Sequence, residues 1–294
     1  MTSADPDWLD RGEYPFADHL LETPHGRVHY VDEGRGPALL MVHGQPTWSF
    51  MYRHVIRGLS PRFRCIAVDL LGFGLSEKPR RFDYRPADHA ATLRRLVDHL
   101  ELDRTSLLVH DWGGPIGLGF GVENAERIER IVALDTWMWS MAEQRAGRWF
   151  SRILGSPLGQ LATRRLDLFV DPFLRRALPQ ETWQRVGACY RGPLAHPADR
   201  QGCALFPKRL VDPWLESVWA GREALADRPA LLVWGGADPA FPAASRERLA
   251  GVFTDCTVDV RDGVGHFVAE ELGPELAATI DAWWSRIDAR AESP

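Results

Sequence analysis

The feature that most constrains the fold is a repeated alternation of short apolar runs with segments of helical length. Six such runs occur along the chain, at 38–43, 64–69, 106–111, 128–135, 230–235 and 256–261. Strands joined by crossovers of helical length pair in parallel and are buried on both faces. Two further strands, 19–23 and 27–32, flank a Pro-His-Gly turn and predict an antiparallel hairpin. The sequence therefore predicts a mostly parallel, eight-stranded sheet with helices on both faces.

A helical block interrupts this alternation between residues 137 and 212. It has no strong strand pattern, and its helical fragments are broken by prolines at positions 157, 172, 179, 193 and 197. We expect a core in two parts, 1–136 and 213–294, with the block 137–212 inserted as a helical cap. Open α/β sheets bind ligands at the carboxyl ends of their strands, which is where we expect the cap to lie. The alternative is a surface elaboration with no role in binding.

Charge and composition exclude several classes of protein. The net charge is −5, from 35 basic and 40 acidic residues without long runs of one sign, so we expect no nucleic-acid partner. No run of 18 apolar residues occurs, so we expect no membrane span and no membrane partner. The acidic first residues lack the apolar core of a secretory signal. The cysteines show no metal-binding or CxxC spacing and predict reduced thiols in a cytoplasmic protein: Cys65, Cys189, Cys203 and Cys256.

A strand that runs directly into a glycine-rich helix start carries the first candidate for chemistry. Residues 107–117 read LLVHDWGGPIG, so Asp111 ends the strand and Gly113 and Gly114 open the helix. A side chain at such a turn is presented at the edge of the sheet, as the nucleophile is in α/β-hydrolases, whose usual motif is G-x-S-x-G. The alternative is an aspartate that only caps the helix.

Three other post-strand loops carry matching signals. HGQP at 43–46 occupies the place that supplies an oxyanion-hole N–H, WGGADPAFP at 234–242 carries Asp238, and GVGHF at 263–267 carries His266. Taken singly, these are a turn, a turn-forming aspartate and a surface histidine. Together they follow the chain order nucleophile, acid, histidine of the α/β-hydrolases.

These motifs identify a resemblance. Over nearly its whole length the chain resembles the haloalkane dehalogenase family of the α/β-hydrolase fold, at 31–53, 69–79, 109–117, 135–139 and 264–267. The pair Asp111-Trp112 is shared with related epoxide hydrolases, whereas HGQPTWSF favours the dehalogenases. The resemblance implies hydrolysis of a halogenated alkane by water to an alcohol, a halide ion and a proton, with no metal or organic cofactor.

The residue types suit that reaction. A carboxylate is ionised at neutral pH and can attack a saturated carbon without a base, so Asp111 would displace halide and form an alkyl ester. His266 would activate water to attack the ester, and Asp238 would orient the imidazole. The backbone N–H groups of Gln45 and Trp112 would stabilise the oxyanion.

The leaving halide requires N–H donors. The indole of Trp112 is the first candidate. The amide of Gln45 is the second: it stands where the family often places an Asn, and its side chain is one methylene longer than that of Asn. A tryptophan of the inserted region is an alternative second donor, the candidates being Trp137, Trp139, Trp149 and Trp183. Each of these four also has an ordinary interpretation as packing.

Asp135 is a second departure from the family pattern. It ends the strand before the cap, where relatives carry Asn or a Glu that serves as the triad acid. The post-strand context of Asp238 favours that residue as the partner of His266, and Asp135 stays open as the alternative acid. Two carboxylates beside one imidazole would raise its pKa.

Two other functions stay open. An epoxide hydrolase uses the same aspartate and histidine, with two cap tyrosines as proton donors, but residues 137–212 contain only Tyr190. A diverged relative could act on a non-halogenated substrate, or bind a ligand without turnover. The substrate chain length, the halogen preference and the oligomeric state are not predicted.

Overall fold

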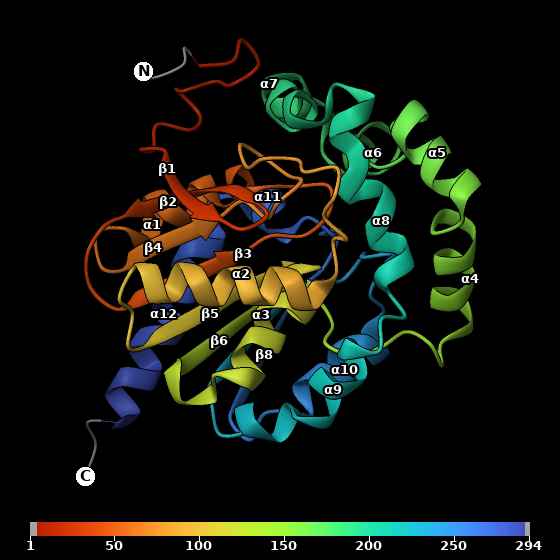
Figure 1. Ribbon diagram of the computed structural model, residues 1–294. Coiled ribbons are helices and arrows are strands. Elements are labelled where there is room, and N and C mark those ends of the chain that lie inside the picture. Colours follow the sequence, from red (N-terminus) through yellow and green to blue (C-terminus); the bar gives the residue numbers. More distant parts are fainter. Residues whose placement is uncertain (1–4, 292–294) are drawn as a thin grey trace.

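A central eight-stranded sheet organises the chain (Figure 1). The structure is a computed structural model, and it describes residues 5–291. From edge to edge the strand order is β1-β2-β4-β3-β5-β6-β7-β8. The strands are β1 (His19–Thr23), β2 (Gly26–Glu33), β3 (Ala38–Val42), β4 (Arg64–Val68), β5 (Thr105–Asp111), β6 (Ile128–Thr136), β7 (Ala230–Gly235) and β8 (Cys256–Arg261).

Strand pairing follows the sequence pattern. β1 pairs antiparallel with β2, and β2 antiparallel with β4, while every other neighbouring pair is parallel. Every residue of β3, β5 and β7 is buried, as expected for parallel strands covered on both faces. The predicted hairpin and mostly parallel sheet are confirmed.

Helices of the core cover the two faces of the sheet. α1 packs on α12, and α2 and α9 pack on α3. These helices are α1 (Arg53–Leu59), α2 (Pro86–His99), α3 (Gly113–Glu123), α9 (Trp214–Ala220), α10 (Ala243–Ala250), α11 (Val268–Leu272) and α12 (Pro274–Ala291). The five-residue helix α11 lies between the His266 loop and α12, and Gly273, with a φ of 54°, separates the two helices.

A layer of helices lies between β6 and β7, to one side of the sheet (Figure 1). Residues 137–229 contain no strand. α4 and α5 pack on each other and on α8, whereas α9 already packs on α3 of the core. The helices of this layer are α4 (Arg145–Leu154), α5 (Pro157–Leu166), α6 (Arg175–Ala177), α7 (Gln180–Arg191) and α8 (Gln201–Arg209), with a π-helical turn η3 (Val170–Leu174) before α6. Within the described residues, no helix has the length and apolar character to cross a membrane.

A buried ion pair joins this helical layer to the core. The guanidinium of Arg53 donates two hydrogen bonds to Glu270, at 2.6 and 2.7 Å, and both side chains are almost completely buried. The hydroxyl of Tyr190, from α7, donates to the same carboxylate at 2.6 Å. Because Glu270 lies on α11, four residues after His266, this network connects α7 to the segment that follows the histidine loop.

Candidate active site

The candidate nucleophile lies where β5 turns into α3. Asp111 is the last residue of β5 and has a φ of 48°, a left-handed conformation that is rare for a residue with a side chain. The turn is tight enough that a Cβ on Gly113 would lie 1.9 Å from the carbonyl oxygen of Val42. The hydroxyl of Thr136 donates to the carbonyl of Asp111 at 2.5 Å. These contacts hold the backbone in the strained turn and present the carboxylate at the end of the sheet.

The two oxygens of Asp111 have different surroundings. Oδ1 accepts a hydrogen bond of 2.8 Å from the backbone N–H of Gln45, in the HGQP loop after β3. Oδ2 lies 3.7 Å from Nε2 of His266. Gly44 allows this approach, since a Cβ there would lie 2.2 Å from Oδ1. The side chain is 13% exposed, so the carboxylate is accessible and faces the imidazole.

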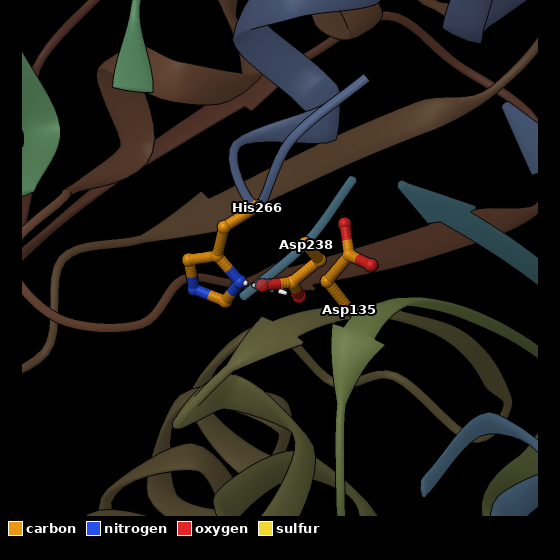
Figure 2. Close-up of side chains that lie close together, drawn as sticks. All are labelled: Asp135, Asp238 and His266. Atoms are coloured by element: carbon orange, nitrogen blue, oxygen red, sulfur yellow. Dashed lines mark hydrogen bonds and ion pairs between the residues drawn. The ribbon is translucent and has the colours of Figure 1, made fainter. Parts of the chain in front are cut away.

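His266 is held from its other side by Asp238. Nδ1 of the imidazole and Oδ2 of Asp238 are 3.0 Å apart, the hydrogen bond drawn in Figure 2. The backbone N–H of Ala240 donates to Oδ1 of the same carboxylate at 2.6 Å. With Nδ1 donating to Asp238, the Nε2 atom faces Asp111.

Asp135 lies behind Asp238 and makes no hydrogen bond to the imidazole (Figure 2). Its Oδ1 accepts a hydrogen bond of 3.0 Å from the backbone N–H of Gly235, while Oδ2 is buried and has no partner among residues 5–291. Burial, reinforced by the nearby charge of Asp238, raises the pKa of Asp135 to about 8. The carboxyl of Asp135 is therefore mostly neutral at pH 7.

The imidazole itself is strongly basic in this arrangement. Burial acts to lower the pKa of His266, but hydrogen bonds and charges of Asp111 and Asp238 outweigh it and raise the pKa to about 10. The sequence indicates that a pair of carboxylates raises this pKa, and attributes the effect to Asp135 and Asp238. In the structure, the two carboxylates that raise the pKa of His266 are Asp238 and Asp111. Asp135 makes no hydrogen bond to the imidazole among the described residues and is mostly neutral at pH 7.

Asp135, Asp238 and His266 are also the described residues whose ligand atoms lie close enough, within 4.8 Å of one another, to be considered for a metal ion. The Nδ1 atom that faces these carboxylates carries the proton shared with Asp238, so it has no free lone pair for a metal. We assign no metal to these three residues.

Trp112 and Gln45 line the same end of the sheet. Trp112 is 5% exposed and its indole N–H makes no hydrogen bond within the described chain. Nε2 of Gln45 donates to the backbone carbonyl of Cys203, in α8, at 3.3 Å, and its Oε1 is buried without a partner. One of the two amide hydrogens of Gln45 thus ties the HGQP loop to the inserted helices.

Of the four other tryptophan candidates, one contacts Trp112. Trp137 packs edge-on against it with the ring centroids 5.0 Å apart, and its buried N–H has no partner. Trp149 is 60% exposed to solvent, so it does not line a dry site. The remaining two pack against cationic side chains, Trp139 on Arg248 and Trp183 on Arg191.

Three supporting residues escape the sequence motifs. His110 donates from Nε2 to the carbonyl of His266 at 2.8 Å, and burial lowers its pKa to about 4, which keeps it neutral. Glu271 accepts hydrogen bonds from the backbone N–H of Gly265 at 2.9 and 3.1 Å and holds the histidine loop. Thr136 fixes the carbonyl of Asp111. His110 and Thr136 lie within stretches that resemble the family, 109–117 and 135–139, but no motif assigns them a role, and Glu271 has no sequence signal.

Several known proteins are similar to this chain over most of its length. Residues 37–271 match the family model described as alpha/beta hydrolase fold, which confirms the predicted fold. Haloalkane dehalogenase 2 of Mycobacterium tuberculosis is 40% identical over 271 residues, covering 91% of this chain and 94% of the relative. A cis-3-alkyl-4-alkyloxetan-2-one decarboxylase of Xanthomonas campestris is 30% identical, covering 93% and 97%. The crystal structure of haloalkane dehalogenase DbeA from Bradyrhizobium elkani, 23% identical, superimposes with a TM-score of 0.82 and covers 94% of this chain and 99% of its own.

We predict that Asp111→Asn lowers the pKa of His266 by roughly 1–2 pH units, because the variant removes one of the two negative charges that raise it. The measurement is an NMR titration of the imidazole, with the intact mass confirming that the amide persists. Asp135→Asn is the matched control, since Asp135 is mostly neutral already and its replacement leaves the imidazole pKa close to that of the parent. A larger effect in the control than in Asp111→Asn would contradict the assignment.

Replacing Asp135 also has a predicted effect on stability. Its pKa in the folded state, about 8, lies above its ordinary value of 3.8, so the folded state binds the proton more tightly. The stability that this proton contributes is complete below pH 3.8 and is lost as the pH rises through about 8. Asp135→Asn should therefore be the more stable protein at high pH, by on the order of 5 kcal/mol, at about 1.4 kcal/mol for each pH unit between the two pKa values.

Urea unfolding between pH 4 and pH 9 measures this difference. We expect the gap between Asp135→Asn and the parent to widen with pH and then level off. Asp103→Asn, at an exposed position, is the control and should show no such widening. A constant gap for Asp135→Asn would contradict the raised pKa.

Proposed function

The chain belongs to the haloalkane dehalogenase family of the α/β-hydrolase fold and is a hydrolase of carbon–halogen bonds, and we propose that Asp111, His266 and Asp238 carry out this reaction on haloalkanes. One observation carries the assignment: Oδ2 of Asp111 lies 3.7 Å from Nε2 of His266, whose Nδ1 bonds Asp238 at 3.0 Å. A carboxylate aimed at a histidine in this way can serve first as nucleophile and then as an ester that the histidine helps water to attack.

The first step is a displacement at saturated carbon. An oxygen of Asp111 forms the C–O bond while the C–halogen bond breaks, and the bonding electrons leave with the halide. The product is an alkyl ester on Asp111 and a halide ion. No base is needed, because the nucleophile is an anion, so a protonated His266 does not impede this step.

The second step depends on the change of charge that the first one makes. The ester is neutral, so His266 loses one of the two carboxylates that raise its pKa. The pKa falls, the proton on Nε2 passes to solvent, and the imidazole can then act as a base. Nε2 then takes a proton from water as the oxygen attacks the ester carbon, and Asp238 stabilises the imidazolium. The backbone N–H of Gln45, already 2.8 Å from Oδ1 of Asp111, stabilises the oxyanion, with that of Trp112 as the second donor. When the intermediate collapses, the proton on Nε2 of His266 passes to the leaving alkoxide, which departs as the alcohol. The second hydrogen of the attacking water, left on the Asp111 carboxyl, is released to solvent.

We assign the halide to the indole N–H of Trp112, which neighbours the nucleophile and has no partner in the described chain. Gln45 retains one amide hydrogen beyond its bond to Cys203 and is the second donor that the sequence predicts. The unpartnered N–H of Trp137, in contact with Trp112, is the alternative.

We also propose that residues 137–212 act as a cap domain on a core formed by 1–136 and 213–294. The support is the hydrogen bond from the side chain of Gln45 to the carbonyl of Cys203, together with the packing of Phe206 on Trp112, whose ring centroids are 4.6 Å apart. Both contacts join α8 to the candidate site. The four cysteines are free thiols, which supports a cytoplasmic location.

The epoxide hydrolase alternative loses support in the structure. The hydroxyl of Tyr190, the single tyrosine of the cap, donates to Glu270 and is buried. It is therefore unavailable as a proton donor to an epoxide oxygen. The 30% identity to an oxetanone decarboxylase keeps a non-halogenated ring substrate as the second candidate.

Covalent trapping tests the proposal. In His266→Phe the base is lost but the nucleophile remains, so incubation with 1-bromobutane or 1,2-dibromoethane should leave an alkyl adduct on Asp111 and release bromide. Intact mass spectrometry and peptide mapping locate the adduct. The double variant Asp111→Ala/His266→Phe is the control and should stay unmodified.

The same assay separates the alternatives. An adduct with styrene oxide alone would support the epoxide hydrolase, and one with a cis-3,4-dialkyl oxetan-2-one alone would support the ring substrate. An unmodified protein across all of these reagents would favour a binding protein and contradict the mechanism.

The halide site has its own prediction. Trp112→Phe keeps the ring but removes the N–H, so halide release should slow by roughly 10- to 100-fold, the effect of about 1–3 kcal/mol. Stopped-flow halide release and halide quenching of tryptophan fluorescence measure it. Trp137→Phe tests the alternative donor. Trp283→Phe, on α12, is the matched control, because its buried N–H also lacks a hydrogen-bond partner among the described residues. Equal kinetics in Trp112→Phe and Trp283→Phe would remove Trp112 from the halide site.

A further inference from the structure

The outer layer of the cap exposes most of the large apolar side chains that the protein leaves in solvent. Ten such side chains are exposed within the described residues, and seven of them lie between positions 149 and 173. Leu158 is 79% exposed and Leu166 69%, more than any of the three outside this segment. The seven are Trp149, Phe150, Ile153, Leu158, Leu161, Leu166 and Phe173. A concentration of this kind on one surface marks a contact site.

The arrangement of α4 and α5 explains why these side chains have no partner inside the protein. Both helices use one face to pack on α8 and on each other. Their other faces form the edge of the molecule on the side away from the sheet (Figure 1). Trp149 and Ile153 are four residues apart on α4, and Leu158 and Leu161 three apart on α5, so each pair lies on one side of its helix.

The same surface is strongly basic, although the protein is acidic. Residues 145–176 contain seven arginines and two aspartates, a net charge of +5 in a chain of net charge −5. Asp167 pairs with Arg200 and Asp171 with Arg191, so neither neutralises the exposed arginines of this face. Six exposed arginines form no ion pair in the described part of the chain: Arg145, Arg148, Arg152, Arg165, Arg175 and Arg176.

A groove lies beside the apolar side chains. It has a volume of about 620 Å³, and its lining includes Arg145, Arg148, Arg152 and Trp149. Guanidinium groups bind phosphate oxygens through paired N–H donors, and an indole beside them suits the boundary between polar and apolar surroundings. The arginines of this groove therefore suit an anionic phosphate group, and Trp149 suits the hydrocarbon next to it.

We propose that this surface, residues 145–176 and here called the cap face, docks the protein on an anionic lipid bilayer. Exposed Trp, Phe and Leu side chains between arginines are the composition of helices that lie in a membrane interface, and negatively charged lipid attracts unpaired arginines. A second copy of the chain fits less well, because a two-fold contact would place two faces of +5 against each other. The sequence predicts no membrane partner because it lacks a span, but a docking face needs none.

Docking in this orientation would also bring the site close to its apolar substrates. This one consequence rests on the proposed function. Haloalkanes are apolar and concentrate in lipid. A bilayer against the cap face would bring α4 and α5 into the region where the substrate collects, with α8 and the Asp111 site behind them. The docking itself does not depend on which substrate the site takes.

Vesicle flotation tests the docking. The full chain should float with vesicles of phosphatidylglycerol and phosphatidylcholine, much less with phosphatidylcholine alone, and less at high salt. Arg145→Gln/Arg148→Gln/Arg152→Gln should lower the partition coefficient roughly 100-fold, since each arginine near an anionic surface contributes about a factor of five. Trp149→Ser/Leu158→Ser should also reduce flotation, because it removes two exposed apolar groups.

Matched controls remove the same groups elsewhere. Arg35→Gln/Arg95→Gln/Arg286→Gln takes away three exposed arginines outside the cap, and Leu20→Ser/Val258→Ser two exposed apolar residues. Both controls should float like the parent. Circular dichroism and adduct formation in the His266→Phe background show that each variant is folded.

Three outcomes would overturn the docking: no flotation of the parent with anionic vesicles, equal flotation with neutral vesicles, or an equal loss in the arginine control. A dimer by light scattering that the cap-face variants convert to a monomer would instead identify the surface as a self-interface. Flotation without any adduct on Asp111 would support the docking and contradict the proposed chemistry. An adduct without flotation would support the chemistry and contradict the docking.

Discussion

The arrangement of the candidate site depends on one backbone constraint, the turn at the end of β5. Asp111 adopts a positive φ there because Gly113 allows α3 to begin almost in contact with the carbonyl of Val42. The turn holds the carboxylate at the carboxyl edge of the sheet, where the loops after β3, β7 and β8 converge. A looser turn would separate Asp111 from both the N–H of Gln45 and the imidazole of His266.

Three carboxyl groups lie near the imidazole of His266, and their different surroundings give them different protonation states. Asp238 has a lowered pKa, because its hydrogen bond and charge interaction with His266 outweigh the effect of burial. Asp135 has a raised pKa, because burial and the charge of Asp238 outweigh its one hydrogen bond from Gly235. The third, Asp111, changes charge during the proposed reaction. The imidazole can thus be an ion in the free protein and a base in the alkylated one, so the first chemical step prepares the second.

The inserted helices have two surfaces with different chemistry. Their inner surface contacts the site through Phe206 and the carbonyl of Cys203, and Tyr190 reaches the buried pair of Arg53 and Glu270. Their outer surface carries exposed apolar groups and unpaired arginines. The helices between β6 and β7 therefore contact the candidate site on one side, and on the other side α4 and α5 carry the proposed docking face.

Local patterns in the sequence were enough to predict the eight strands, the helical insertion and the four loops that carry Asp111, Gln45, Asp238 and His266, because strand periodicity and turn residues act over short distances. They favoured Asp238 over Asp135 as the partner of the imidazole, but they could not predict that Asp135 is mostly neutral. That state depends on burial and on the charge of Asp238, which lies far away along the chain. The same holds for the bond from Gln45 to Cys203, 158 residues away, and for the cap face. An arginine or leucine in a helix pattern does not reveal which side of that helix the fold leaves in solvent, and only the packing of α4 and α5 on α8 decided it.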